Sequence, residues 1–362
     1  MQWFLCNFQK LFQVYNQTKQ WYNKRTLDKK GGDEVRRLFS RLWDNFLKCD
    51  KVLLLMCLVT SFLGCIVIAS ATNHRETLRY VFVQLGAIGI GVACYLLVSC
   101  VDLEFVSEHR MALVVFNTVL LLLLVPFGTD FQSGNRSWLD FPFLPFSIQP
   151  AELCKITYIL IMASVMAANQ RRISSWKSVI SMLFHLGLLF GVNMVVSKDA
   201  GVSLIFAFIF VGMAFAGGVS LIWFGAGIGA LVAVAPVLWF KIMQPHQKNR
   251  ILMLFDPTVD PQGIGVRYHT KRSLLSLTGG GLLGQGLFNG NRTQIGALPA
   301  QHTDYIFSAI GEELGYVGCI VTILLLVAII ARCIWVGTRS TDYMRRLICF
   351  GVSSSLIFQV VS

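Results

Sequence analysis

Residues 299–318, PAQHTDYIFSAIGEELGYVG, decide the fold, because they place acidic side chains at the mouth of an apolar helix and inside it. At about 100° per residue, small residues recur on one line of that helix below Asp304. They are Ser308, Gly311, Gly315 and Gly318. Small residues at this spacing allow another helix to approach closely. The pattern therefore predicts a tight helix junction with Asp304 at its rim.

Two further carboxylates lie inside the same apolar helix. Glu312 falls about 80° around the helix from Asp304 and roughly 12 Å deeper, and Glu313 falls about 180° around. The two glutamates are therefore not expected to share one partner. Intramembrane carboxylates are costly, so each is expected to be functional or paired. Asp304 also has a purely structural interpretation, since Thr303 is a good N-cap and an acid in the first turn stabilises the helix dipole.

The composition is that of an integral membrane protein. Apolar residues make up 55% of the chain and charged residues 14%, and the mean hydropathy is +0.62. The net charge of +12 comes from basic residues in a tail and in loops, with no zinc or RNA-binding motif, so no nucleic-acid partner is predicted. The ten cysteines lack CxxC spacing and lie mostly in or beside apolar segments, which predicts core residues and neither disulfides nor metal ligands.

Nine apolar segments are long enough to cross a bilayer as helices. They are residues 52–72, 78–100, 111–127, 152–169, 178–196, 200–216, 219–240, 304–336 and 347–362, of which 304–336 is long enough to be tilted or broken. The predicted fold class is therefore all-α, a polytopic integral membrane protein. The break at 197–199 is so short that the fifth and sixth segments are also compatible with one re-entrant pair. The last segment reaches Ser362 without a polar flank, so we expect the natural protein to continue beyond it.

The chain divides into a basic tail, residues 1–50, and a membrane domain, residues 51–362. The tail lacks a cleavable signal pattern, and residues 34–48 have the spacing of an amphipathic helix that lies on an anionic inner leaflet or docks a partner. Basic residues concentrate on one side, in the tail and in alternate loops: Arg110, the cluster of Arg171, Arg172 and Lys177, and Arg339, Arg345 and Arg346. The short loops on the other side carry only Arg75, Arg79, Arg136 and Lys198. This asymmetry predicts a cytoplasmic N-terminus and an extracytoplasmic loop at residues 241–303.

A polar loop, residues 128–150, runs directly into the fourth apolar segment. Glu152 and Lys155 lie three residues apart on one face of that helix, as a structural ion pair or as a functional pair that binds an anionic ligand. Beside Arg136, Trp138 is either part of an interfacial aromatic belt or a platform for a sugar ring or lipid headgroup.

The long loop is rich in turns and glycine. Asp256 and Asp260 each precede a proline, which predicts turns before it predicts a metal site. The segment TGGGLLGQGLFNGNRTQ, residues 278–294, lacks a GK[ST] sequence and a preceding strand, so it is neither a P-loop nor a dinucleotide-binding motif. It is either a backbone nest for a phosphate, flanked by Arg272 and Arg292, or a flexible lid.

Five stretches carry a resemblance to a known family. They are SWLDFPFLPFSIQPAELCK (137–155), KDAGVSLIFAFIFVGMAFAGG (198–218), RILMLFDPTVDPQGIG (250–265), GGGLLGQGLFNGNRTQ (279–294) and LPAQHTDYIFSAIGEELGYVG (298–318). Together they resemble the FtsW/RodA/SpoVE (SEDS) family of bacterial cell-wall polymerases, over about residues 51–362. The family normally has ten spans and a late loop close to PLPFVSYGGS, which is absent here. The segment GVRYHTKRS (265–273) is about two residues longer than in relatives, which leaves the contacts of residues 267–273 open.

The resemblance implies a polytopic enzyme that polymerises lipid II into glycan strands on the outer face of the bacterial cytoplasmic membrane, for cell shape, elongation or division. It also implies a class B penicillin-binding transpeptidase as partner. The family's essential outer-loop aspartate falls on Asp304. Its QPSE or QPAE motif and the lysine that follows fall on Gln149, Pro150, Ala151, Glu152 and Lys155.

For such an enzyme, an inverting glycosyltransferase, we expect Asp304 to act as general base on the acceptor's 4-hydroxyl. Cations must balance the diphosphate of the donor. The candidates are Lys155, Arg272, Arg292 and a divalent cation, Mg²⁺ or Mn²⁺. The remaining substrate-binding candidates are Glu152, Gln149, Trp138, Arg136, His302 and Glu312. His302 and Asp304 are two residues apart without a third ligand, so no protein metal ligands are assigned. Two alternatives stay open: a transporter that flips a lipid-linked precursor, and a non-catalytic scaffold of the cell-wall machinery.

Overall fold

The computed structural model describes residues 50–361 with the exception of 76, 99–101, 130–135, 141–146, 244–247, 249–251, 253–267 and 298–299. The predictions for the tail helix at 34–48, for Asp256 and Asp260, and for Arg267 concern residues outside this description.

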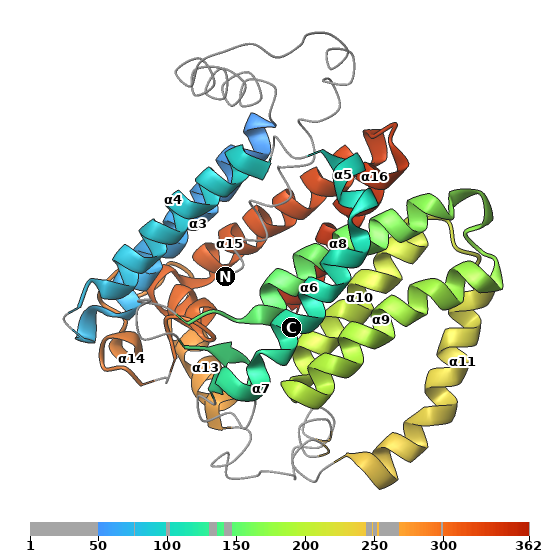
Figure 1. The fold of residues 1–362 in the computed structure, drawn as a ribbon. Coiled ribbons are helices and arrows are strands. Elements are labelled where there is room, and N and C mark those ends of the chain that lie inside the picture. Colours follow the sequence, from blue (N-terminus) through green and yellow to red (C-terminus); the bar gives the residue numbers. More distant parts are fainter. Residues whose placement is uncertain are drawn as a thin grey trace, which may run out of the picture. The chain divides into compact units, whose positions relative to one another are not determined.

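Helices account for most of the described chain (Figure 1). In chain order they are α3 (Lys51–Ala71), α4 (Arg79–Val98), α5 (Leu103–Glu108), α6 (Arg110–Leu122), α7 (Leu124–Phe127), α8 (Pro150–Ala168), α9 (Trp176–Val196), α10 (Ala200–Ala216), α11 (Leu221–Val237), α13 (Tyr268–Gly279), α14 (Asn291–Gln294), α15 (Ile306–Arg339) and α16 (Tyr343–Val361). The shorter helical turns are η2 (Asn73–Arg75), η3 (Gln170–Arg172) and the π-helical η4 (Leu238–Ile242). Strands β1 (Gly128–Thr129) and β2 (Trp138–Leu139) pair antiparallel.

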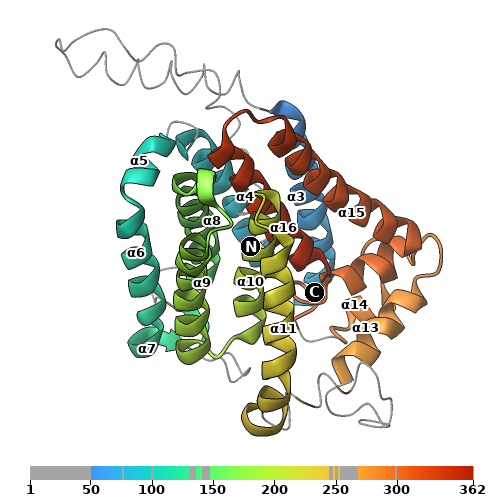
Figure 2. The same ribbon diagram turned by 90° about the vertical axis from the view of Figure 1, so that its right-hand side faces the viewer.

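Eight helical stretches of the described chain are long and apolar enough to cross a membrane. They are α3, α4, α6 with α7, α8, α9, α11 with η4, α15 and α16. The remaining apolar helix, α10, has 17 residues. Each segment predicted from the sequence is therefore helical, which confirms the polytopic all-α fold class. α9 and α10 are separate helices that lie side by side in both views (Figures 1 and 2).

The chain forms two compact units, and the first comprises the described residues of Met1–Ser61, Leu85–Val219 and Leu326–Ser362. Its central helix is α8, which packs against α6, α9, α10 and α16 (Figure 2) and is the most buried of the spans. Tyr158 of α8 is fully buried, with its ring edge-on to Phe206 of α10 at 5.5 Å between centroids. Polar side chains on α8 are thus held inside the first unit.

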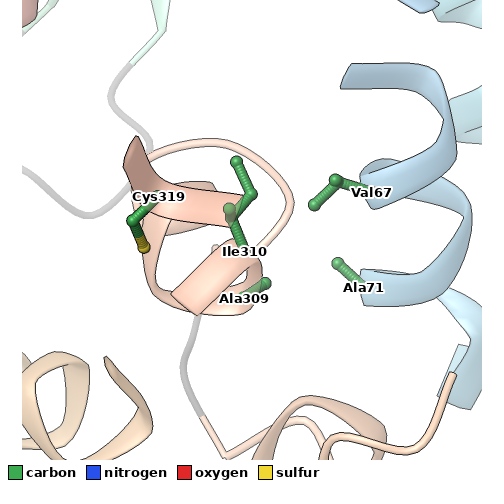
Figure 3. Close-up of a cluster of buried hydrophobic side chains, with 5 residues drawn as sticks. All are labelled: Val67, Ala71, Ala309, Ile310 and Cys319. Atoms are coloured by element: carbon green, nitrogen blue, oxygen red, sulfur yellow. The ribbon is translucent and has the colours of Figure 1, made fainter. Parts of the chain in front are cut away.

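The second unit comprises the described residues of Phe62–Gln84 and Ser220–Leu325. It joins the end of α3 and the start of α4 to α13, α14 and the first part of α15, and it also contains α11, which has no buried residue. A cluster of buried apolar side chains forms its core (Figure 3): Val67, Ala71, Ala309, Ile310 and Cys319. This core fixes the start of α15 against the end of α3.

α15 is broken at Gly315, where the backbone (φ 67°, ψ −166°) leaves the helical region. Before the break, the predicted close helix junction is confirmed, because α13 packs on α15. The hydroxyl oxygens of Ser273 and Ser308 are 2.5 Å apart, and Leu277 lies against Gly311. At Gly315 the prediction of one continuous small-residue face is wrong, because a left-handed glycine ends the helical line there.

The glycine-rich loop that follows α13 fills this break. The N–H groups of Gln285 and Gly286 donate to the carbonyl oxygens of Glu312 and Glu313, just before the break, at 2.9 and 3.0 Å. On the other side, the Tyr316 N–H donates to the Gly281 carbonyl oxygen at 3.0 Å. These bonds replace the intrahelical bonds that the break removes. The loop is therefore a structural insert in α15. The phosphate nest and the flexible lid stay predictions.

Candidate functional site

A first cluster of polar side chains surrounds Asp304, which lies in the turn just before α15. Its carboxylate is exposed, and none of the residues that the structure describes donates a hydrogen bond to it. The capping interpretation is wrong, because α15 begins at Ile306 and the Thr303 hydroxyl donates to the Ala300 carbonyl oxygen at 3.1 Å. Asp304 is therefore open to a ligand.

Gln301 fixes the turn that carries Asp304. Its side chain is 2% exposed, and Nε2 donates to the carbonyl oxygens of Ala71 and Thr293 at 2.6 and 2.8 Å. These two acceptors belong to the end of α3 and to α14. The exposed carboxylate thus stands on a turn that two helices hold in place.

His302 packs against Tyr80 at the start of α4, with 4.4 Å between ring centroids. Arg75 reaches the same place, since its Nη1 donates to the Tyr80 hydroxyl at 2.9 Å. Burial lowers the pKa of His302, the neighbouring Arg75 and His74 lower it further, and the negative charge of Asp304 opposes them. His302 is therefore mainly neutral at pH 7.

α13 provides another side of this cluster. The ring of His269 lies 5.9 Å from the ring of Tyr305. Burial raises the pKa of the Tyr305 hydroxyl, and the adjacent Asp304 carboxylate raises it further. Arg272, one turn along α13, donates from Nη1 to the backbone carbonyl of Ala297. α13 therefore brings a predicted substrate-binding arginine into the unit that contains Asp304.

Arg75, Tyr80 and Gln301 are members of this cluster that sequence reasoning missed. The distribution of charge marks Arg75 only as one of the basic residues of the short outer loops. The sequence feature that could have pointed to this cluster is Arg75, close to Tyr80 in the loop between two spans. That signal becomes specific only when the fold brings the loop to His302, more than two hundred residues later in the chain.

Glu312 is buried and holds α14. Its two carboxylate oxygens accept from the Arg292 N–H at 2.6 Å and from the Thr293 hydroxyl at 2.9 Å. Glu313 is also buried and accepts from Gln294 at 2.9 Å. The two glutamates share no donor, as predicted, yet both bind the same short helix because α14 lies against the turn of α15 just before the break. Glu312 belongs to the frame of the site, and only the side chain of Arg292 is left for substrate.

A second cluster lies in the first unit, at the start of α8. Nζ of the fully buried Lys155 is 2.6 Å from Oε1 of Glu152, whose side chain is 16% exposed. The predicted pair is therefore formed. Asp199, which the sequence analysis did not single out, caps α10 by accepting from the Val202 N–H at 3.1 Å and also accepts from the Ser137 hydroxyl at 3.3 Å.

Three more predicted residues lie near this pair in the chain. Gln149 occupies the N-cap position of α8 without a side-chain cap bond, and Trp138 pairs with Thr129 in the β1–β2 hairpin. Arg136 precedes that hairpin strand and is exposed. The ten predicted site residues thus divide into two sets. Asp304, His302, Arg272, Arg292 and Glu312 lie in the second unit, and Lys155, Glu152, Gln149, Trp138 and Arg136 lie in the first.

Protein ligands for a metal ion do not gather in the part of the chain that the structure describes. No group of three or more His, Cys, Asp or Glu side chains has the geometry to hold one. His302 and Asp304 are only a pair, and the His302 ring is packed on Tyr80. A divalent cation, Mg²⁺ or Mn²⁺, therefore stays a prediction, without a ligand set assigned among the described residues.

Sequence comparisons give relatives that extend over nearly the whole described region. Residues 50–362 match the FtsW/RodA/SpoVE family, described as cell cycle proteins. The peptidoglycan glycosyltransferase MrdB of Escherichia coli (strain K12) is 28% identical over 320 residues, which cover 88% of this chain and 83% of MrdB. A probable peptidoglycan glycosyltransferase FtsW of Geobacter metallireducens is 27% identical over 318 residues, covering 86% of this chain and 83% of the relative.

Solved structures share the fold. One is a chain from a study of how a peptidoglycan synthase complex coordinates polymerization and crosslinking, with a TM-score of 0.71 and 24% identity over 86% of this chain and 85% of that one. Another is the rod shape determining protein RodA of Thermus thermophilus, with a TM-score of 0.58 and 21% identity over 86% and 83% of the two chains. At these identities the structural likeness supports the fold alone.

Proposed function

The chain belongs to the FtsW/RodA/SpoVE family of cell cycle proteins, and from that premise we propose that it is a peptidoglycan glycosyltransferase that polymerises lipid II. The protein is a multi-pass membrane protein. Its relatives are named as peptidoglycan glycosyltransferases, which places its work in bacterial cell-wall synthesis. The observation that carries the mechanism is the exposed carboxylate of Asp304, without a donor among the described residues, on a turn fixed by the buried Gln301.

The proposed reaction is an inverting glycosyl transfer. Asp304 accepts the proton of the acceptor sugar's 4-hydroxyl while that oxygen attacks C1 of the donor. The bond from C1 to the polyprenyl diphosphate breaks, and the diphosphate leaves with the electron pair. An α-linked donor thereby becomes a β-1,4 product. A carboxylate within hydrogen-bond reach contributes about 10²- to 10⁴-fold to such a step.

The leaving diphosphate needs positive charge, and the second unit provides it near Asp304. Arg75 reaches the hydroxyl of Tyr80, whose ring packs on His302, and Arg272 lies on α13 beside the same cluster. Guanidinium groups match phosphate oxygens geometrically and keep their charge at any working pH. We therefore place Arg75 and Arg272 first among the cations, ahead of Arg292 and of the buried Lys155, which already pairs with Glu152. His302 of the second unit, and Trp138, Arg136 and Gln149 of the first, remain proposed substrate-binding residues.

The proposal includes place and partner. The chain would lie in the bacterial cytoplasmic membrane, with the N-terminus in the cytoplasm and residues 241–303 outside, as the distribution of basic residues indicates. A class B penicillin-binding transpeptidase would crosslink the strands that this chain extends. One solved relative of the fold comes from a peptidoglycan synthase complex, which supports such an assembly.

Polymerisation of purified lipid II by the full protein tests the proposal. Asp304→Asn keeps the size of the side chain and removes its charge, so we expect at least about a 100-fold loss of glycan product. The matched control is Glu108→Gln, an exposed carboxylate on α5, which should leave the product unchanged. Undiminished polymerisation by Asp304→Asn would remove Asp304 as the base.

Two other functions have their own outcomes in related assays. Movement of lipid II across vesicles without polymer formation would support a transporter. Normal growth of cells whose single copy carries Asp304→Asn would support a non-catalytic scaffold.

A further inference from the structure

The C-terminal end of α15 gathers two arginines on one exposed aromatic ring. Arg332, Trp335 and Arg339 are spaced by three and four residues, so they share one face of the helix. The guanidinium carbons of Arg332 and Arg339 lie 4.3 and 4.4 Å from the centroid of the Trp335 ring. We call these three residues the Trp335 cluster. It concentrates positive charge at one end of a membrane span.

One described carboxylate offsets part of this charge. Asp50 lies just before α3, and its Oδ2 is 2.7 Å from Nε of Arg332. Its other oxygen accepts from the Leu53 N–H at 3.1 Å, so Asp50 also caps α3. Lys51 follows Asp50 and is exposed, which brings a further positive charge to the same pair of helix ends.

The next carboxylate along the chain is already engaged. Asp342 accepts from the N–H groups of Met344 and Arg345 at the start of α16, and it lies 3.4 Å from the Arg345 guanidinium. Within the described ranges, Arg339 therefore has no acidic partner. The cluster keeps an excess of positive charge and an unused planar hydrogen-bond donor.

The position of the cluster suits a lipid headgroup. The span of α3 begins at Lys51 and the span of α15 ends at Arg339, so the ends of two spans meet where Asp50 pairs with Arg332. Trp335 is 42% exposed, as expected for a tryptophan at the level of the headgroups. Basic sites between the cytoplasmic ends of spans attract anionic headgroups, and arginine can bind phosphate oxygens in a bidentate manner.

We propose that the Trp335 cluster binds the phosphate of an anionic phospholipid headgroup. Arg339 donates to the phosphate oxygens, and the Trp335 ring supports the glycerol region. Arg332 is held by Asp50 and keeps the ring in place, and Lys51 adds long-range attraction. This site is independent of glycosyl transfer, so it stands or falls separately from the proposed function.

Lipid binding to the detergent-solubilised protein, measured by native mass spectrometry, tests the site. We expect the protein to bind phosphatidylglycerol more tightly than phosphatidylcholine. Arg339→Gln should weaken the phosphatidylglycerol affinity about fivefold, the size expected for one basic residue at a membrane surface. Trp335→Leu should weaken it as well. The matched control is Arg172→Gln, an exposed arginine of η3 on the same predicted side, which should leave the affinity unchanged.

Further measurements distinguish a bound headgroup from non-specific attraction and from a free-phosphate site. Equal affinity for the two lipids, or equal losses in Arg339→Gln and Arg172→Gln, would overturn the proposal, because either result means non-specific attraction. Displacement of the lipid by millimolar inorganic phosphate would also overturn it in favour of a free-phosphate site. Unchanged melting temperatures of the variants would show that they lose lipid affinity and not stability. A lowered melting temperature of Arg339→Gln that accounts for its lost affinity would overturn the proposal.

Discussion

Asp304 and Glu312 are two carboxylates of one short sequence, and the structure gives them opposite surroundings. Asp304 is exposed and accepts no hydrogen bond from the described residues, whereas Glu312 is 1% exposed and accepts two. A buried carboxylate whose oxygens are satisfied is committed to the frame. An exposed carboxylate on a fixed turn keeps its lone pairs for a reacting proton. The surroundings of a carboxylate, and not its place in the sequence, therefore decide whether it is catalytic or structural.

The largest effect should come from Asp304→Asn, and it should be confined to turnover. We expect activity to fall by about 10²- to 10⁴-fold, since the base is lost. The melting temperature should stay near that of the wild type, because an exposed side chain without described partners contributes within about 0.5 kcal/mol to stability. Lipid II binding measured beside turnover completes the test. A large fall in melting temperature would mean that Asp304 has a structural role like that of Glu312, and the two carboxylates would no longer differ in role.

The frame itself is most sensitive at Gly315. Any residue other than glycine at this position would have to adopt an unfavourable positive φ. Its Cβ would also overlap the backbone of Gly284 and Leu282 in the inserted loop. We expect Gly315→Ala to cost about 3 kcal/mol, from the unfavourable φ and the steric overlap together.

Gly281→Ala is the matched control for this change. Gly281 also has a positive φ, of 60°, but a Cβ there meets nothing within 4 Å, so only about 1–2 kcal/mol should be lost. Thermal unfolding in detergent compares the two variants. Equal losses would mean that the overlap with the loop adds nothing and that the loop does not close the break.

A smaller effect is expected when Glu312 is replaced. Glu312→Ala leaves the Arg292 N–H and the Thr293 hydroxyl without their acceptors, which should cost about 2 kcal/mol. Glu312→Gln keeps one acceptor oxygen and should cost less. Hydrogen exchange of the α14 amides should become faster in the alanine variant. If Glu312→Gln abolished polymerisation while the α14 amides stayed protected from hydrogen exchange, Glu312 would have a catalytic role and not a structural one.

The parts of this arrangement that the sequence predicted are local in the chain. Apolar runs gave the spans, small residues at helical spacing gave the junction of α13 with Ser308 and Gly311, and three-residue spacing gave the pair of Glu152 with Lys155. Each of these follows from helix geometry alone.

The parts that the sequence did not predict depend on distant segments. The break in α15 at Gly315 is stable only because a loop some thirty residues earlier supplies its hydrogen bonds. Glycine at a helical position gave no sign of that insertion, since glycine is equally compatible with close helix packing. Arg75 and Tyr80 reach His302 through the fold, so no spacing in the chain marks them as neighbours.

The smallest effect concerns the charge that Asp304 exerts on its neighbour. Burial and Arg75 lower the pKa of His302, and Asp304 raises it. Because the folded pKa is below the ordinary value of about 6.5, the turn is fully stable above that pH and loses stability as pH falls through the lowered pKa. Arg75→Gln removes a lowering cause, so His302 should titrate at a higher pH. Asp304→Asn removes the raising cause, so it should titrate at a lower pH.

NMR titration of the His302 ring measures the direction of these two shifts. Glu312→Gln is the control, since its carboxylate is used by α14 and should not move the His302 titration. We expect the His302 pKa to shift in opposite directions in Arg75→Gln and Asp304→Asn and to stay unchanged in Glu312→Gln. That result would mean that Asp304 and Arg75 act on the His302 ring and that Glu312 does not. A shift of equal size in Glu312→Gln would mean that the frame carboxylate also sets the charge of the site, and the distinction between the two acids would be lost.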